Sequence, residues 1–221
     1  MSTGARGRAA VEAPTRAQRT VARRAAEARA TIPDVEFGTE VDMDRSLALC
    51  EQGSHSLSAV LTRACGLALR EHPRANAGYR DGQFELYSRI NVGLLIASGD
   101  DLVAATVFDA DAKSLAELTE VIGDLRARAG SLTQPERSGA TFTLAHHEDA
   151  GVAWEVPLIW GGQAAAAAAG GVRQAPVIRG DEVVAGRLMT LTLACDHRIL
   201  YGPLAARFLA RIKELLEHEA L

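Results

Sequence analysis

Residues 188–203 read LMTLTLACDHRILYGP, and this stretch gives the clearest indication of the fold. The run Leu188 to Ala194 is hydrophobic on both faces, which predicts a strand that is buried at the centre of a sheet. Asp196-His197-Arg198 follows this strand, and Gly202-Pro203 then begins a predicted helix, with proline in its first turn. The pattern therefore places a histidine where a central strand ends and a turn begins.

The sequence on the N-terminal side supplies the remaining elements of the predicted fold. Ser114-Leu-Ala-Glu117 is a capping box that opens a helix ending at Gly130. Two apolar runs around Gly99-Asp100-Asp101 predict a hairpin, and the run Ala164 to Ala169 predicts a buried segment where backbones approach closely. Further helices are predicted over 14–30 and 56–71, and further strands over 35–43 and 141–145. We expect one α+β domain over residues 14–221, preceded by a flexible leader over residues 1–13.

Composition excludes several classes of protein. The 221 residues are 48% hydrophobic and 24% charged, as in an ordinary folded domain. The formal net charge of −4 gives no general case for binding nucleic acid, and no stretch is apolar enough for a transmembrane helix. Cys50, Cys65 and Cys195 are scattered without a CxxC pair, which is typical of reduced thiols in a cytoplasmic protein.

His197 is one of six histidines and has the most suggestive position. Imidazole suits general-base catalysis because its unperturbed pKa is about 6.5. The alternative is a core histidine whose ring nitrogens bond to backbone groups, and spacing alone favours that alternative.

His146 and His147 form the second setting with potential chemistry. Adjacent residues of an extended chain point to opposite sides, so these two histidines are poorly placed to share one metal ion. We therefore expect a polar strand end here and no metal site.

Taken together, the segments resemble the catalytic domain of the dihydrolipoyl acyltransferases, the core subunits of 2-oxoacid dehydrogenase complexes. The resemblance spans roughly residues 14–218. The segments that carry it are RTVARR (19–24), TIPDV (31–35), LALREHPRANA (67–77), DADAKSLAEL (109–118), GATFTL (139–144) and DHR (196–198) with Gly202. The last is similar to the family's DHRxxDG signature, which chloramphenicol acetyltransferase shares in a looser form.

The resemblance implies a chloramphenicol acetyltransferase-like fold, with a mixed sheet, flanking helices and a single domain. It also implies a homotrimer whose active sites are channels at the subunit interfaces, entered by coenzyme A from one end and by the acceptor from the other. His197 would be the general base, and acetyl-CoA would be a co-substrate, with no permanently bound cofactor. The resemblance does not identify the residues that would bind coenzyme A.

The chain departs from the family at two positions close to this chemistry. Ala145 stands where the family has its oxyanion-stabilising serine, and Tyr201 stands where an acidic or amide residue precedes the glycine. Thr143, two residues from Ala145 on the same predicted strand face, and Tyr201 are candidate replacement donors, and the alternative is that both only pack. His146 is a further conceivable donor.

These departures, together with a leader too short to hold a lipoyl domain, suggest a free-standing enzyme similar to the acetyltransferases of tetronate pathways. We therefore expect transfer of an acetyl group from acetyl-CoA to a small-molecule hydroxyl in natural-product biosynthesis. One alternative is the dihydrolipoamide acyltransferase core of a 2-oxoacid dehydrogenase complex. Another is a catalytically dead scaffold that forms trimers and binds partners.

Overall fold

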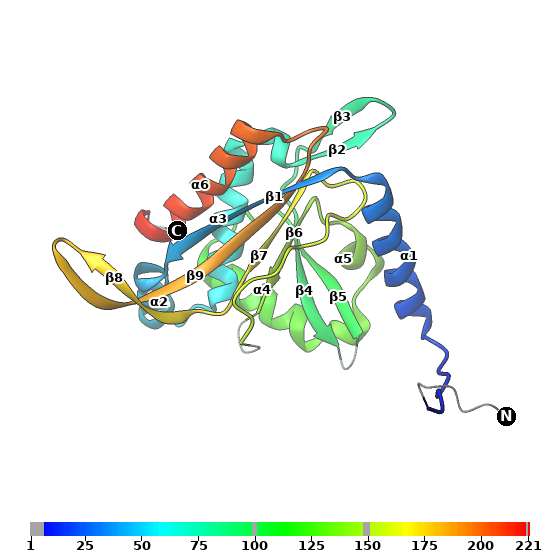
Figure 1. The fold of residues 1–221 in the computed structure, drawn as a ribbon, viewed down its shortest axis with the longest axis horizontal. Coiled ribbons are helices and arrows are strands. Elements are labelled where there is room, and N and C mark those ends of the chain that lie inside the picture. Colours follow the sequence, from blue (N-terminus) through cyan, green and yellow to red (C-terminus); the bar gives the residue numbers. More distant parts are fainter. Residues whose placement is uncertain (1–6, 99–100, 148–150, 220) are drawn as a thin grey trace.

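The strand β9 (Glu182–Asp196) lies between β1 (Asp34–Asp42) and β7 (Ala165–Ala169) in the computed structural model, so the strand predicted at the centre of the sheet is an interior strand, one place from the edge strand β1 (Figure 1). The structure describes residues 7–98, 101–147, 151–219 and 221. Among these, residues 7–15 form neither helix nor strand, and the predicted leader over 1–13 lies partly outside the described residues.

The sheet is mixed, as predicted. Its strand order is β1-β9-β7-β6-β4-β5, and β8 (Arg173–Arg179) pairs with the part of β9 that extends beyond β7. The strand β6 (Phe142–His146) runs parallel to both β4 (Val92–Ser98) and β7, and the other pairs in this sheet are antiparallel. The register of β4 with β5 (Asp101–Val107) confirms the predicted hairpin, although Gly99 and Asp100 lie outside the described residues.

The main core lies between the sheet and a layer of helices. These helices are α2 (Asp44–Gly53), α3 (Leu57–Glu71), α4 (Leu115–Ala127) and α6 (Gly202–His218). Ser56 and Ser114 cap α3 and α4, and the capping box of Ser114 with Glu117 is present as predicted. Phe142 of β6 and Phe208 of α6 meet edge to face at a centroid distance of 5.9 Å, which joins the helix layer to the middle of the sheet.

The predicted end of one helix is wrong. The capping-box helix α4 ends at Ala127 and not at Gly130, because Arg128 leaves the helical conformation and a single 3-10 turn, Ala129–Ser131, follows. The glycine therefore lies inside the turn beyond the helix, and does not mark the end of the helix itself.

Several elements had no clear signal in the sequence. They are α2, the small hairpin of β2 (Ala77–Arg80) and β3 (Gln83–Leu86), the short helix α5 (Gln134–Ser138), and the strand β8. The hairpin of β8 and β9 projects away from the body of the molecule (Figure 1).

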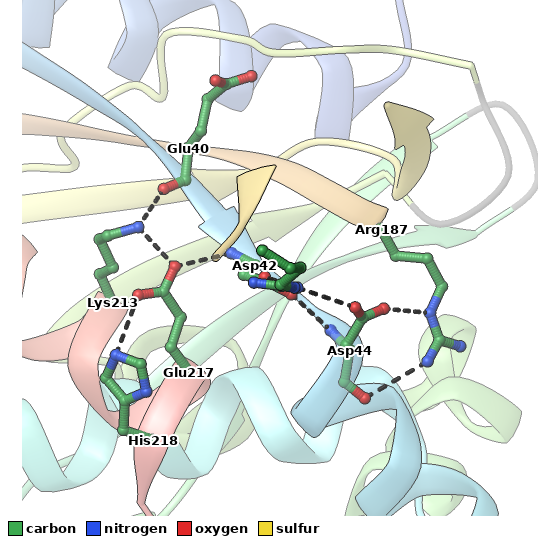
Figure 2. Close-up of polar contacts among 8 residues, drawn as sticks. Glu40, Asp42, Asp44, Arg187, Lys213, Glu217 and His218 are labelled. Atoms are coloured by element: carbon green, nitrogen blue, oxygen red, sulfur yellow. Dashed lines mark hydrogen bonds and ion pairs between the residues drawn. The ribbon is translucent and has the colours of Figure 1, made fainter. Parts of the chain in front are cut away.

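Polar contacts from both strands tie this hairpin to β1 and α2. Arg187 of β9 donates to Asp44 at 2.8 Å, and Arg179 of β8 pairs with both Asp42 and Asp44. On the other side of β1, Glu217 accepts from the backbone N–H of Asp42 at 2.8 Å (Figure 2). Three segments distant in sequence therefore meet at the end of β1.

The helix α1 (Arg16–Thr31) stands apart from this helix layer. It lies at the edge of the molecule next to β5 and α5 (Figure 1), and most of its residues are exposed. Among the described residues, no helix combines the length and the apolar character that a membrane span requires.

The alanine run forms a strand that is buried on both faces, which confirms the predicted close approach of backbones. All five residues of β7 are buried between β6 and β9. A connection formed by residues 151–163 lies against one face, where the hydroxyl of Thr192 donates to the carbonyl of Glu155 and the N–H of Gly171 donates to that of Val152 at 2.8 Å. A β-carbon at Gly170 would lie 2.0 Å from the carbonyl oxygen of Ala153.

We predict that Gly170→Ala lowers the free energy of unfolding by about 3 kcal/mol, because one backbone segment must move away from another to make room for the methyl group. Gly123→Ala in α4 is the matched control, since nothing lies within 4 Å of a β-carbon there. That substitution should raise the stability by about 0.5–1 kcal/mol through helix propensity. Urea denaturation measures both values, and equal stabilities of the two variants would contradict the prediction.

Candidate active site

The turn after β9 places His197 at the surface. Its backbone N–H donates to the carbonyl of Pro33 at 2.9 Å, which ties this turn to the chain between α1 and β1. The side chain is exposed, so His197 is not the core histidine that spacing alone favoured. An exposed imidazole at a fixed turn can accept a proton from a bound molecule without leaving a buried charge behind.

Asp196 holds the shape of this turn. Its carboxylate is 1% exposed and accepts two charge-assisted hydrogen bonds from Arg198, at 2.9 Å from Nε and 2.7 Å from Nη2. Its backbone carbonyl accepts from the N–H groups of Ile199 and Leu200, both at 2.9 Å. Hydrogen bonding to Asp196 raises the pKa of the Arg198 guanidinium, and that guanidinium also lies over the ring of Tyr79, 4.4 Å from its centroid.

Tyr201 lies beside His197. Their ring centroids are 6.3 Å apart with an interplanar angle of 57°, and Tyr201 is 44% exposed at the N-cap position of α6. The structure therefore brings these two predicted site residues together. Both face outward from the chain, so neither ring lies in the core.

Thr143 lies elsewhere, inside β6. It is 1% exposed, and its hydroxyl donates to Oε1 of Gln163 at 2.8 Å, while Nε2 of Gln163 donates to the carbonyl of Ala140 at 3.2 Å. The one proton of the hydroxyl is thus engaged by Gln163. Ala145 lies two residues further along the strand, is 2% exposed and carries no polar group.

A hollow of about 1100 Å³ adjoins Thr143. It lies between α1 and the body of the protein, and Thr143, Gln163, Asp196 and Arg198 all contribute to its wall. His197 and Tyr201 do not line it. Within one chain, the predicted base and the predicted hydroxyl donor Thr143 therefore belong to two different surfaces.

The two adjacent histidines have separate partners. Nδ1 of His146 lies 3.0 Å from the hydroxyl oxygen of Ser58, to which Arg126 also donates, at 2.7 Å. Nε2 of His147 lies 2.9 Å from a carboxylate oxygen of Glu155. In the part of the chain that the structure describes, no group of three or more His, Cys, Asp or Glu side chains could hold a metal ion.

Sequence reasoning did not single out Gln163 or Trp160, which form part of the wall of the hollow. The sequence signal next to them is the pair Gly161-Gly162, directly before Gln163. The glycines let this connection turn, since Gly162 has a φ of +86°, and the carbonyl of Gly162 accepts from the hydroxyl of Tyr87 at 2.8 Å.

Sequence comparison relates this chain to acetyltransferase components of pyruvate dehydrogenase complexes. The chain is 29% identical over 220 residues to the dihydrolipoyllysine-residue acetyltransferase component of the pyruvate dehydrogenase complex of Acholeplasma laidlawii. That match covers 94% of this chain and 40% of the relative. The chain thus spans about half the length, or less, of the curated relatives it matches.

Solved structures share the fold. A probable dihydrolipoamide acetyltransferase from Listeria monocytogenes is 27% identical, with a TM-score of 0.87 over 96% of this chain and 97% of the other. The dihydrolipoamide acetyltransferase of Azotobacter vinelandii, in which a serine, a histidine and an asparagine have been investigated for their role in catalysis, is 22% identical, with a TM-score of 0.90 over 99% and 95%. Chloramphenicol acetyltransferase is 14% identical with a TM-score of 0.57 over 88% and 94%, which confirms the predicted fold class.

These relatives overturn one expectation drawn from the sequence. The chain was expected to be a free-standing acetyltransferase for a small-molecule hydroxyl in natural-product biosynthesis. The proteins that align with nearly its whole length are instead named for the pyruvate dehydrogenase complex or as dihydrolipoamide acetyltransferases. The findings favour the alternative, a dihydrolipoamide acyltransferase core, over the expectation drawn from the departures at Ala145 and Tyr201.

Residues 7–221 match the family described as 2-oxoacid dehydrogenases acyltransferase (catalytic domain). This match covers almost the entire chain and includes the turn with His197, the strand with Thr143 and the helix layer between them. The chain therefore belongs to the 2-oxoacid dehydrogenase acyltransferase family.

Proposed function

We propose that this chain is an acyltransferase core that moves an acetyl group between coenzyme A and a dihydrolipoyl thiol, with His197 as the general base. The observation that carries the proposal is the exposed imidazole of His197, held by the Asp196–Arg198 pair at the end of β9 in a chain of this acyltransferase family. The names of the relatives support the choice of thiol acceptor and of acetyl-CoA.

Spacing along the chain supports the assignment of roles. In the Azotobacter vinelandii enzyme, a serine precedes the histidine under study and an asparagine follows it. Ala145 precedes His197 by the same number of residues as that serine precedes its histidine, and Tyr201 follows His197 by the same number as that asparagine follows it. His197 is therefore kept in this chain, while the other two positions have changed.

The reaction needs one proton acceptor and a place for one negative charge. His197 takes the proton of the attacking thiol, and the sulfur forms a bond to the acyl carbon. The carbonyl oxygen becomes an oxyanion until the bond between carbon and the departing sulfur breaks, and His197 then returns the proton to that sulfur. Tyr201 has an exposed hydroxyl next to His197, whereas the proton of Thr143 is engaged by Gln163, so Tyr201 is the better-placed donor.

We further propose that the active site is completed by a second copy of the chain in a trimer. His197 and Tyr201 face outward, and the hollow beside Thr143 lies on a different surface of the same chain. A channel between subunits would bring the outward histidine of one copy to the β6 strand of the next. Among the solved relatives, one structure is the cubic core of the pyruvate dehydrogenase multienzyme complex.

We predict that the purified chain transfers acetyl from acetyl-CoA to free dihydrolipoamide, as read by mass spectrometry of the S-acetyl product. His197→Ala should lower the rate about 10²- to 10⁴-fold, because the attacking thiol loses its general base. His218→Ala is the matched control, since His218 is the last residue of α6 and its side chain is 72% exposed.

The outcomes separate the alternatives. Unchanged transfer by His197→Ala would remove this histidine from the mechanism. A wild-type protein that forms trimers and produces no S-acetyl product would favour the catalytically dead scaffold over the enzyme.

We predict that Ala145→Ser accelerates acetyl transfer at least about tenfold, because a hydroxyl at this position adds a donor for the oxyanion, and one such donor is worth on the order of 3 kcal/mol. Ala167→Ser is the control. It adds the same hydroxyl to the neighbouring strand β7, but on the face packed in the main core. Equal rates for Ala145→Ser and the wild type would show that position 145 no longer faces the reacting carbonyl.

A further inference from the structure

A row of stacked side chains leads from the β2–β3 hairpin to the turn that carries His197. The guanidinium of Arg198 lies over the ring of Tyr79 in β2, 4.4 Å from its centroid. The ring of Tyr79 meets that of Phe84 in β3 at a centroid distance of 6.2 Å, and the guanidinium of Arg74 lies 4.6 Å from the centroid of Phe84. The proposed mechanism gives Tyr79 no role, although its ring lies against the residue that follows the proposed base.

The hairpin is packed closely against this turn. A small second core, with Tyr79 packed against it, consists of Ala77, Ala164 and Ile199, all fully buried. A β-carbon at Gly78 would lie only 3.0 Å from the carbonyl oxygen of Gly162, so the backbones of the hairpin and of the connection before β7 nearly touch. The ring of Tyr79 is therefore presented to Arg198 by packed segments on both sides.

Arg198 binds one carboxylate through both its backbone and its side chain. Its N–H donates to Oδ1 of Asp196 at 3.0 Å, and its Nε and Nη2 donate to the same carboxylate at 2.9 and 2.7 Å. The turn closed by the N–H contact contains His197 as its middle residue, so the carboxylate restricts the backbone from which the imidazole projects. Asp196 is buried, and a guanidinium that moved out into water would leave its charge without a partner.

The guanidinium of Arg198 is the mobile part of this arrangement, because its side chain is 33% exposed. Its hydrogen bonds to Asp196 lie in the plane of the group, whereas the ring of Tyr79 covers one face of that plane. A guanidinium is attracted to the face of an aromatic ring, and more strongly where water is excluded. The two contacts therefore restrain the group in different directions.

We propose that Tyr79 is a positioning residue for acyl transfer, whose ring holds the guanidinium of Arg198 against Asp196 and thereby keeps the imidazole of His197 directed at the attacking thiol. This inference rests on the proposed function, in which His197 is the general base. A small misplacement of a base lowers the rate of proton transfer without changing how the substrates bind. The ring face is what acts, so a phenylalanine at this position would serve as well as the tyrosine.

Steady-state transfer from acetyl-CoA to free dihydrolipoamide measures the effect on the base. We expect Tyr79→Leu to lower kcat about fivefold to tenfold and to leave the KM for both substrates within about twofold. Tyr79→Phe should keep at least about half of the wild-type kcat, since its ring also attracts a guanidinium. The comparison of KM with kcat is needed because Tyr79 also lines the hollow beside Thr143, and a residue that bound substrate would change KM.

Phe84→Leu is the matched control. It makes the same change from an aromatic ring to leucine at the residue paired with Tyr79 across the hairpin, and the guanidinium over Phe84 is that of Arg74. Its kcat should stay within about twofold of the wild-type value.

A second background tests whether Tyr79 acts through Arg198. Arg198→Lys keeps the charge and removes the planar group that stacks and forms paired hydrogen bonds. In this background Tyr79→Leu should change kcat less than about twofold, because the group through which the ring acts is gone.

Hydrogen exchange gives a readout that needs no activity. The N–H groups of Ile199 and Leu200 both donate to the carbonyl of Asp196 at 2.9 Å, so they exchange faster whenever this turn opens. We expect exchange at these two groups to be at least about threefold faster in Tyr79→Leu, and unchanged in Tyr79→Phe and Phe84→Leu.

The outcomes separate this inference from the proposed function. Unchanged kcat and exchange in Tyr79→Leu, in a chain that His197→Ala inactivates, would overturn the inference alone. A raised KM with unchanged kcat, or an equal loss of kcat in Tyr79→Phe or Phe84→Leu, would overturn it as well. A wild-type chain without transfer would overturn the proposed function, and the exchange rates would then decide whether Tyr79 holds the turn.

Discussion

The close approach of backbones around β7 is the constraint on which the rest of the structure depends. Five alanines place only a methyl group on each face of this strand, so β6 and β9 are joined through a thin strip with little side-chain volume. One face packs in the main core under the helices, and the other accepts the connection 151–163. Gly170, one residue beyond the strand, must also be small, because a carbonyl of that connection leaves no room for a β-carbon.

The packing around β7 positions the residues of the candidate site. The connection that lies on the alanine face ends at Gln163, immediately before β7, and Gln163 is the residue that engages the hydroxyl of Thr143. Beside the start of β7, at the C-terminal end of β9, Asp196 is buried and draws Arg198 back against the turn, which leaves His197 pointing outward. The hydroxyl and the imidazole are therefore fixed by two connections, the one that enters β7 and the one that leaves β9, which lie at the same end of the sheet.

Periodic segments of the sequence predicted their structure well, because burial of one face imposes the pattern. The strand over 35–43 and the helix over 56–71 are present with small shifts of their ends, and the strand predicted over 188–194 is present but begins earlier, at Glu182. The β8–β9 hairpin was missed because it projects beyond the core and no buried face imposes a pattern on it. Its apolar Ile178 and Val183 are exposed, and it is held by carboxylates of β1 and α2 that lie far away in sequence.

The site was predicted only in part, because some of its contacts join residues that are far apart in the sequence. Resemblance pointed to His197, Tyr201 and Thr143, and the structure places the first two side by side. The partner of Thr143 was not predictable from the sequence, because Gln163 is twenty residues away and reaches it only once the alanine strand has formed.

The changed residues around His197 were first taken to suggest an alcohol acceptor, and the chemistry of acyl transfer shows why that inference fails. An alcohol is far less acidic than a thiol, so a change of acceptor alters the demand on the base. The oxyanion, however, forms on the carbonyl oxygen of the acyl group, whichever nucleophile attacks. If position 145 faces the reacting carbonyl, as the resemblance implies, Ala145 lacks a hydroxyl donor for this oxygen, and the loss weighs equally on a thiol and on an alcohol. In the proposed mechanism, the residue at position 145 therefore affects the rate of transfer and does not identify the acceptor.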